Sequence, residues 1–192
     1  RFVMTYPNEQ LPAGRPVKKS PARSAMDHAG AQWGCSWGLE IPLMFAGTNF
    51  SETPTLKRSN AFDVVAEECA AVRERVGLLD ISGFSRYEVT GPNAEAWLGR
   101  VLAGRLPPPG RARLAPMLAP SGRLKGDLTV LNWGDQSWWI MGSYYLRNWH
   151  MRWFHDYRAT GVEVRDLSDA MVGFGITGPK SRDLLSALMH QD

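Results

Sequence analysis

The sequence predicts an α+β fold with ferredoxin-like strand–helix repeats. One observation is an internal echo, in which a strand pattern, Thr-Gly-Pro and a helical pattern follow one another at 85–103 and again at 172–189. Glycine ends a strand and proline suits the first turn of a helix, so the same strand–turn–helix unit is expected twice. The other observation is that further alternating strands separate the helical patterns. Coincidence is the alternative reading of the echo, because Gly-Pro opens many helices.

The composition is that of a globular protein with a sizeable core. Of its 192 residues, 44% are hydrophobic and 21% are charged, which excludes disorder for most of the chain. No apolar run approaches the roughly 20 residues of a membrane helix. A net charge of +3 does not by itself indicate nucleic acid. We therefore expect neither a membrane nor a nucleic acid as a partner.

The two cysteines, Cys35 and Cys69, are too few for a disulfide framework. Their scarcity indicates a reducing compartment, which would be the cytoplasm or, in a eukaryote, the mitochondrial matrix. We expect both cysteines to be buried as small apolar residues.

Two parts of the chain differ in character. Residues 1–50 are expected to form an interdomain arm, and residues 51–192 the beginning of the domain that follows. The chain lacks an initiator methionine, and a helical pattern stops abruptly at Asp192. We interpret it as a fragment of a longer protein, with a small complete subunit as the alternative.

The arm contains too many prolines and glycines for long regular elements, and only 22–29 could form a helical turn or two. Trp33, Trp37 and Phe45 nevertheless require burial. The arm is therefore predicted to be ordered, largely irregular and packed against a neighbouring domain.

The next elements have clearer signals. Asn60 is expected to cap a helix that Gly77 ends. Apolar residues at helical spacing predict its inward face: Phe62, Val65, Ala66, Cys69, Val72 and Val76. Residues 77–82 indicate a turn into a short extended segment, 85–90 an alternating strand and 94–103 a helix.

In the second half of the chain, the sequence pattern predicts further strands at 112–118, 124–133 and 137–141, joined by turns at 119–122 and 134–135. A helix is expected over 144–160, with an inward stripe formed by Leu146, Trp149, Trp153 and Tyr157. Strands follow at 162–166 and 172–176.

Most catalytic signatures are absent. The chain has no phosphate-binding Gly-x-x-x-x-Gly-Lys-Ser/Thr, no Gly-x-Gly-x-x-Gly between a strand and a helix, and no Cys-x-x-Cys. His150 and His155 are five residues apart, so they do not stack on one helix face as zinc ligands would. Each histidine is more readily a surface or edge residue than a ligand, and no metal site is expected. The tryptophans are more readily core residues than stacking platforms.

The most informative residue is Asp127, near the start of the strand 124–133. A carboxylate in a mostly apolar sheet costs stability unless it is paired. Gly126 beside it would let a ligand approach the backbone closely. The alternative is an ordinary carboxylate on the solvent-exposed face of an edge strand.

Five segments occur in the order and spacing of a known family. They resemble the folate-binding aminomethyltransferases, which include the T-protein of glycine cleavage: Arg75–Ser82, Tyr87–Ala94, Met117–Gly122, Gly126–Val130 and Ile176–Pro179. The arm resembles the segment that leads into the folate domain of dimethylglycine and sarcosine dehydrogenases. It does so through Tyr6-Pro7-Asn8-Glu9, Gly14-Arg15-Pro16, Ser20-Pro21 and Trp37-Gly38-Leu39-Glu40.

The resemblance implies the aminomethyltransferase folate-binding fold, incomplete here, and a tetrahydrofolate site in residues 51–192. In such dehydrogenases a flavin domain oxidises an N-methyl amine, and tetrahydrofolate captures the one-carbon unit as 5,10-methylenetetrahydrofolate. FAD would then lie in a separate domain outside this chain. The expected partners are folate, an N-methyl amine and the rest of the polypeptide or a flavin subunit, and an oligomer is expected.

The resemblance also assigns site residues. Asp127 matches the family's acidic residue, whose implied role is to hydrogen-bond the folate amine during carbon transfer. The implied folate contacts are Met117, Leu114, Gly126 and Tyr87. T-proteins usually carry a second acid where Gly126 stands and tend to have a tyrosine where Leu114 stands. Both departures favour the dehydrogenase branch.

Three other functions remain open. One is the folate domain of another demethylase, such as a metal-dependent amine-oxide enzyme, and another is a glycine-cleavage T-protein. The third is a non-catalytic folate-binding assembly factor, a class that carries a reactive cysteine in a Lys-Gly-Cys-Tyr-like motif. Neither Cys35 nor Cys69 has that sequence context.

Overall fold

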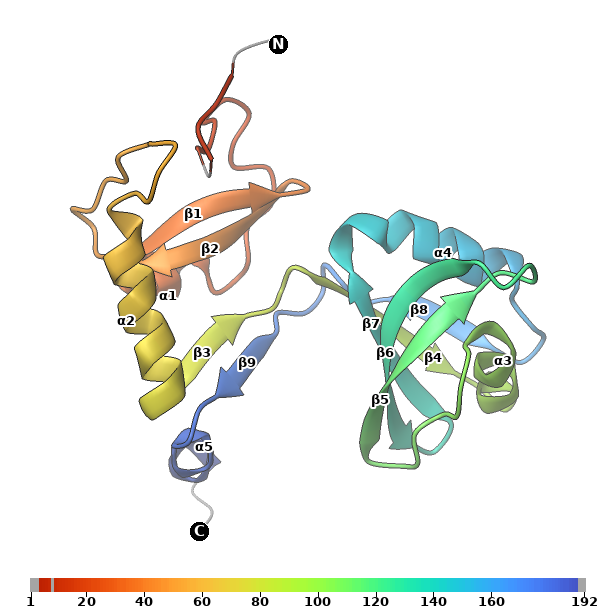
Figure 1. The fold of residues 1–192 in the computed structure, drawn as a ribbon. Helices are drawn as coiled ribbons and strands as arrows, with labels where there is room; N and C mark the ends of the chain where they lie inside the picture. The colour runs from red at the N-terminus through yellow and green to blue at the C-terminus, as the bar shows by residue number, and fades with distance from the viewer. Residues whose placement is uncertain (1–3, 8, 190–192) are drawn as a thin grey trace. The chain divides into compact units, whose positions relative to one another are not determined.

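The computed structural model describes residues 4–7 and 9–189. The chain divides into two compact units, one formed by Arg1–Ser82 with Val172–Asp192 and the other by Gly83–Met171. We call them unit 1 and unit 2. Both contain helices and strands, which confirms the α+β class (Figure 1). None of the described helices is both long enough and apolar enough to cross a membrane.

Unit 2 is a five-stranded sheet with two helices on one face. The strand order is β5-β6-β7-β4-β8, and every neighbouring pair is antiparallel. The bounds of its elements are β4 Phe84–Thr90, α3 Ala94–Val101, β5 Arg111–Leu118, β6 Leu124–Gly134, β7 Ser137–Ser143, η1 Tyr144–Leu146, α4 Arg147–Asp156 and β8 Glu163–Asp166. These strands and α3 confirm the predicted elements to within a few residues.

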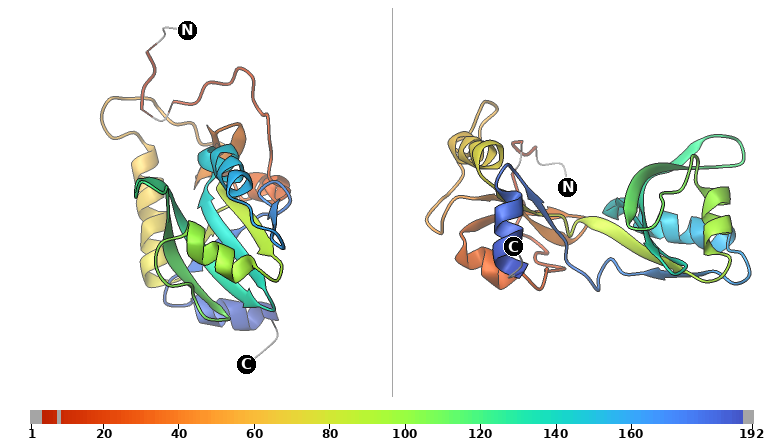
Figure 2. Two further views of the ribbon diagram at one scale, coloured as in Figure 1. Left: turned by 90° about the vertical axis from the view of Figure 1, so that its right-hand side faces the viewer. Right: turned by 90° about the horizontal axis from the view of Figure 1, so that it is seen from below.

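The core of unit 2 lies between the sheet and the two helices. Alternate residues of β6 and β7 are buried, as the period of a strand requires. Trp97 and Leu98 of α3 and Phe154 of α4 pack with these strand residues in one hydrophobic cluster. Figure 2 shows α3 and α4 on the same side of the strands. The other face of the sheet has no helix of unit 2 over it.

Helix α4 differs from its prediction in extent and in orientation. The segment 144–146 is a 3₁₀ turn, and the α-helix ends at Asp156. The buried residues of α4 are His150 and Phe154, whereas Trp149 and Trp153 are only partly buried. The expected inward stripe was wrong because large aromatic residues on a helix need not face its core.

Unit 1 consists of smaller elements. They are α1 Arg23–His28, β1 Ala31–Ser36, β2 Leu39–Phe45, α2 Ala61–Glu74, β3 Gly77–Asp80, β9 Phe174–Thr177 and α5 Ser181–Met189. Strands β1 and β2 form an antiparallel hairpin, and β3 pairs antiparallel with β9.

The hairpin corrects the prediction of a largely irregular arm. Trp37 and Gly38 both have positive φ, which closes a tight turn between β1 and β2. Pro42 is accommodated beside a register shift at Gln32/Trp33, and a two-stranded ribbon leaves it free of a second neighbour. The predicted burial of Trp33, Trp37 and Phe45 concerned contacts with a neighbouring domain, and it stays a prediction. So do the domain boundaries at residue 50.

Helix α2 also departs from its prediction at both ends. The Asn60 side chain makes no capping bond and instead accepts a hydrogen bond of 2.9 Å from the Thr53 N–H. Gly77 is not a C-cap but the first residue of β3, and a Cβ there would lie 2.4 Å from Val72 Cγ2. Phe62 and Cys69, expected to face inward, are exposed. Cys35 is only half-buried, so the predicted burial of both cysteines was wrong.

The internal echo is confirmed in structural detail. A strand ends at Thr90 and another at Thr177, and each is followed by a helix after Gly-Pro. Gly91 and Gly178 have similar positive φ values of 117° and 121°. A Cβ at either position would lie within 2.6 Å of a backbone carbonyl oxygen, of Gly161 and of Arg75 respectively. Only glycine fits both turns, so the two places share one geometry.

Candidate functional site

Asp127 lies on the open face of the sheet of unit 2. Its neighbours on β6, Gly126 and Leu128, are buried against the helices, whereas Asp127 is exposed on the opposite face. Asp127 is paired in register with Pro116 of β5, and Leu114 is paired with Thr129 two residues further along. The side chain of Leu114 is 70% exposed. Asp127 and Leu114 therefore belong to one surface.

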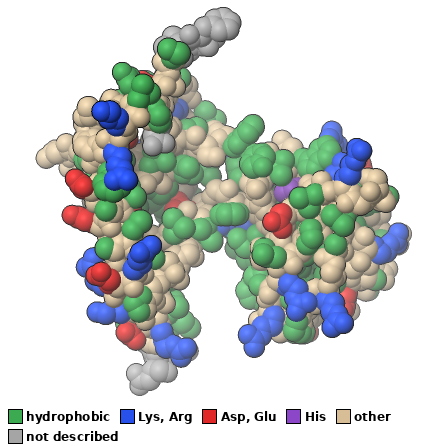
Figure 3. All heavy atoms as spheres, viewed as in Figure 1, with side chains coloured by type: hydrophobic (Ala, Val, Ile, Leu, Met, Phe, Trp, Pro, Cys, Tyr) green, Lys and Arg blue, Asp and Glu red, His purple; other side chains and the backbone are tan. Residues whose placement is uncertain are grey.

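This open face is largely apolar. The pairing of Thr129 with Met141, and of Leu131 with Trp139, brings further side chains of β6 and β7 to it. Its apolar members, all exposed or half-buried, are Leu114, Pro116, Leu131, Trp133, Trp139 and Met141. Figure 3 shows hydrophobic side chains reaching the surface of unit 2. Such a surface fits a flat organic ring system better than a hydrated ion.

The side-chain carboxylate of Asp127 forms no hydrogen bond or ion pair within the part of the chain that the structure describes. A carboxylate accepts hydrogen bonds only, through two oxygens. Placed at the margin of an apolar surface, it can accept a hydrogen bond from an amine N–H of a ligand and stabilise a positive charge beside it. No other predicted site residue on this face is ionisable.

The remaining predicted contacts lie on the other face. Met117 and Tyr87 are fully buried in the core between the sheet and the helices. The side-chain position of Gly126 also points to that side, where a Cβ would lie 3.0 Å from His150 Nε2. The structure thus brings Asp127 and Leu114 together and separates them from Met117, Gly126 and Tyr87.

His150 is the residue that the sequence analysis missed. It was expected at the surface or an edge, but only 1% of it is exposed. Its Nδ1 shares a hydrogen bond of 3.0 Å with the Tyr87 hydroxyl, while the buried Nε2 has no partner among the described residues. Burial lowers the pKa of His150 to about 4, and burial raises the pKa of Tyr87. Both groups are therefore neutral near pH 7.

A charged cluster anchors the far edge of the sheet. Arg147 of α4 forms ion pairs with Asp166 of β8 and, at 2.6 Å, with Asp169. The Tyr144 hydroxyl donates a hydrogen bond of 2.8 Å to Asp169. Burial alone would lower the pKa of Arg147, but its hydrogen bonds to these two carboxylates outweigh burial and hold that pKa above its ordinary value. Because Arg147 of α4 pairs with both carboxylates, the cluster fastens β8 to the helix layer.

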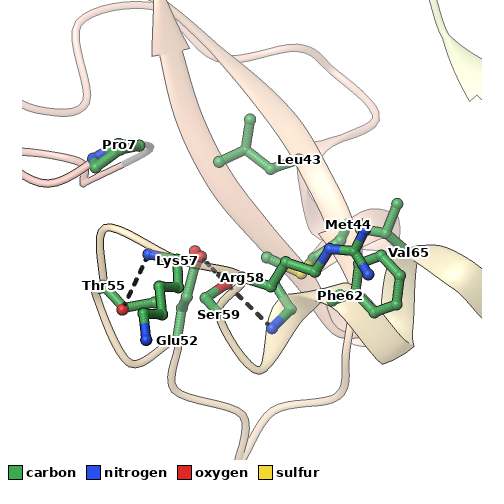
Figure 4. A pocket seen from close by; sticks show the side chains of 11 residues that line it. Pro7, Leu43, Met44, Glu52, Thr55, Lys57, Arg58, Ser59, Phe62 and Val65 are labelled. Carbon is green, nitrogen blue, oxygen red and sulfur yellow. Dashed lines mark hydrogen bonds between the residues drawn. The ribbon is translucent and has the colours of Figure 1, made fainter.

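Unit 1 contains a hollow of its own, which Figure 4 shows from close by. Leu43, Met44, Phe62 and Val65 form its apolar wall. Among its polar groups, the Ser59 hydroxyl donates a hydrogen bond of 2.5 Å to Glu52. None of the predicted site residues lines this hollow. In the described residues, no three His, Cys, Asp or Glu side chains are grouped so that they could hold a metal ion.

The architecture is that of a known fold. The fold matches the crystal structure of the glycine cleavage system aminomethyltransferase T from Bartonella henselae with a TM-score of 0.73, over 92% of this chain and 44% of that one. At 20% sequence identity this likeness concerns the fold, which is the predicted aminomethyltransferase fold. Residues 23–192 match the GCVT N-terminal domain, and the chain belongs to that family.

Curated relatives match this chain over nearly its full length. The mitochondrial dimethylglycine dehydrogenase of Rattus norvegicus is 27% identical over 99% of this chain, which corresponds to 23% of the length of that enzyme. The 4-methylaminobutanoate oxidase (formaldehyde-forming) of Paenarthrobacter nicotinovorans is 29% identical over 100% of this chain and 24% of its own length. The chain therefore spans about a quarter of these relatives.

Proposed function

We propose that this chain is part of the tetrahydrofolate-binding domain of a flavin-dependent N-methyl amine dehydrogenase of the dimethylglycine or sarcosine type. The observation that carries the proposal is the unpaired carboxylate of Asp127 on an open apolar sheet face. The similarity to a dimethylglycine dehydrogenase over nearly the whole chain supports it. The flavin belongs to a domain outside this chain and supplies the oxidised amine.

The one-carbon step requires a base and a site for positive charge. A substrate iminium carries its methylene carbon bound to a positively charged nitrogen. One amine of tetrahydrofolate attacks that carbon, the substrate amine leaves with one proton, and the second folate amine closes the methylene bridge with release of the other proton. In this proposal Asp127 orients the attacking N–H and stabilises the cationic intermediates. The apolar side chains around it receive the folate rings and exclude water.

A second candidate is an oxidase that releases the carbon as formaldehyde. The name of the relative from Paenarthrobacter nicotinovorans describes such an outcome, and that relative covers the whole chain. In such an oxidase, no one-carbon unit would be transferred to folate at the open face. An aminomethyltransferase of glycine cleavage is favoured less, because Gly126 stands where a second carboxylate is usual in T-proteins.

The experiment compares the two carbon products. The full-length protein is supplied with N,N-dimethylglycine or sarcosine and tetrahydrofolate, and methylenetetrahydrofolate and free formaldehyde are both quantified. Asp127→Asn keeps the shape and removes the charge, so it should slow methylene transfer roughly 10²- to 10⁴-fold and leave amine oxidation intact. Formaldehyde should accumulate instead. A wild-type protein that yields formaldehyde alone would select the second candidate.

We extend the proposal to the cellular compartment and the oligomeric state of the protein. We place it in a reducing compartment, the cytoplasm or a mitochondrial matrix, because it has only two cysteines and both are free. We also propose that the whole protein is an oligomer.

A further inference from the structure

The short segment that carries Asp127 is held from its buried side by helix α4. The indole N–H of Trp149 donates a hydrogen bond of 3.3 Å to the carbonyl oxygen of Lys125. The Lys125 ammonium lies 4.9 Å from the ring centre of Trp149 and 5.1 Å from that of Trp153. Both contacts tie the residue two positions before Asp127 to the same helix.

His150 occupies a notch formed by two glycines. A Cβ at Gly126 of β6 would lie 3.0 Å from His150 Nε2, and a Cβ at Gly142 of β7 would lie 3.0 Å from His150 Cε1. Distances this short are tighter than nine in ten real Cβ contacts. The imidazole therefore packs directly on the backbone of both strands, and a side chain at either position would require it to shift by a few tenths of an ångström.

Tyr87 fixes the imidazole from strand β4. Besides the hydrogen bond to Nδ1, the two rings meet edge to face with centroids 5.8 Å apart. Phe154, one helical turn after His150, lies 6.3 Å from it and 5.2 Å from Tyr87. The buried rings of Tyr87 and Phe154 thus hold His150 in one orientation against Gly126.

We propose that His150, held by Tyr87, is a positioning residue that sets the place of Asp127 from the opposite face of the sheet. This inference rests on the proposed function. Asp127 follows Gly126 directly, so a shift of the Gly126 backbone moves the carboxylate on the open face. His150 itself is buried and touches no ligand on that face. Because transfer depends on close alignment of reacting groups, a displacement of about 1 Å can cost about 100-fold in rate.

The competing explanation is that His150 merely stabilises the core. Such a role would lower the amount of folded protein without acting through Asp127. A double-mutant cycle separates the two, because residues that act through one another lose their separate effects when combined.

The test measures methylenetetrahydrofolate formation in the full-length protein, together with the affinity for tetrahydrofolate. His150→Asn removes the ring from the notch, and Tyr87→Phe removes only the hydroxyl that holds it. Each should slow methylene transfer roughly 10- to 100-fold, with little change in tetrahydrofolate affinity. In an Asp127→Asn background neither change should slow transfer further. Tyr87→Phe keeps the test decisive if His150→Asn does not fold.

Leu98→Ala is the matched control. Leu98 is fully buried on α3 in the same core, so its truncation destabilises unit 2 without removing a contact to Lys125 or Gly126. It should leave the transfer rate of folded protein unchanged. The proposal is overturned if His150→Asn and Tyr87→Phe behave like Leu98→Ala, or if their effects persist undiminished beside Asp127→Asn. A wild-type protein that forms no methylenetetrahydrofolate overturns the proposed function and this inference together.

Discussion

The two faces of the five-stranded sheet in unit 2 differ in what their side chains contact. On one face the residues of β6 and β7 alternate into a core shared with α3 and α4, and that core contains fully buried Tyr87, Trp97 and Phe154. On the other face, apolar residues of the same strands are exposed or half-buried around Asp127. The comparison teaches that one strand can serve two purposes. Its buried side fixes the backbone, and its open side presents Asp127, the group that we propose acts in carbon transfer.

The largest expected difference between the faces is in stability. Phe154→Ala should lower the free energy of unfolding by roughly 3–5 kcal/mol, because the ring is fully buried and the cavity cannot collapse completely. Trp133→Ala on the open face should cost only about 0.5–1.5 kcal/mol, since Trp133 is 57% exposed and loses mainly its edge-to-face contact with Trp139. Denaturant unfolding of both variants measures the difference. Equal losses would contradict the assignment of the faces.

The buried face should also make unit 2 sensitive to acid. His150 has a folded-state pKa of about 4, below the ordinary 6.5, so the unfolded chain binds its proton first as the pH falls. The stability that neutral His150 contributes is complete above pH 6.5 and is lost progressively down to about pH 4, by roughly 3 kcal/mol. Unfolding curves between pH 7 and pH 4 test this.

His150→Leu is the control for the acid effect. Leucine cannot bind a proton, so the part of the pH dependence that arises at this site should disappear even if the variant is less stable at pH 7. A variant that loses stability between pH 6.5 and pH 4 as steeply as the wild type would show that His150 is not the group responsible.

Alanine substitutions at two glycines of unit 2 should change the free energy of unfolding by smaller amounts, and with opposite signs. Gly142→Ala should destabilise by about 1–3 kcal/mol, because its Cβ would lie 2.6 Å from Leu128 Cδ2 and 3.0 Å from His150 Cε1. Gly99→Ala should stabilise by about 0.5–1 kcal/mol, since Gly99 lies within α3 and a Cβ there meets nothing within 4 Å. Thermal unfolding of the two variants measures both signs. A tolerated alanine at 142 would mean that the notch around His150 is not tight.

The sequence predicted the strands of unit 2 well, because period-two alternation and glycine turns are local signals. The same alternation places the side chain of Asp127 on the opposite face of the sheet from Gly126 and Leu128, as observed. Alternation could not predict which of the proposed folate contacts lie on the same face as Asp127. Tyr87 and Met117 come from other strands, and only the fold determines the register of those strands. The roles of all five residues remain predictions.

His150 was missed for a physical reason. Helix α4 carries Trp149 and Trp153 beside His150 and Phe154, and hydrophobicity alone favoured the tryptophans as its inward side. The decisive constraint is the space left by Gly126 and Gly142, which lie on two strands. The hairpin of β1 and β2 was missed similarly. Its glycines and proline indicate breaks locally, yet Gly34 makes room for Leu43 of the partner strand, 2.8 Å from where a Cβ would lie.

The smallest expected effect concerns Leu114, the open-face neighbour of Asp127. Leu114→Ala should change the free energy of unfolding by no more than about 0.5 kcal/mol, because 70% of the side chain is already exposed. If the open face receives the rings of tetrahydrofolate, the same change removes apolar contact area from the complex and should weaken tetrahydrofolate binding roughly 3- to 10-fold. Titration of the full-length protein with tetrahydrofolate measures this.

Leu56→Ala is the control, since Leu56 is 82% exposed in unit 1 and belongs to no strand of this sheet. Leu56→Ala should change neither quantity. An unchanged affinity of the Leu114 variant would remove Leu114 from the folate surface and leave Asp127 as its only tested member.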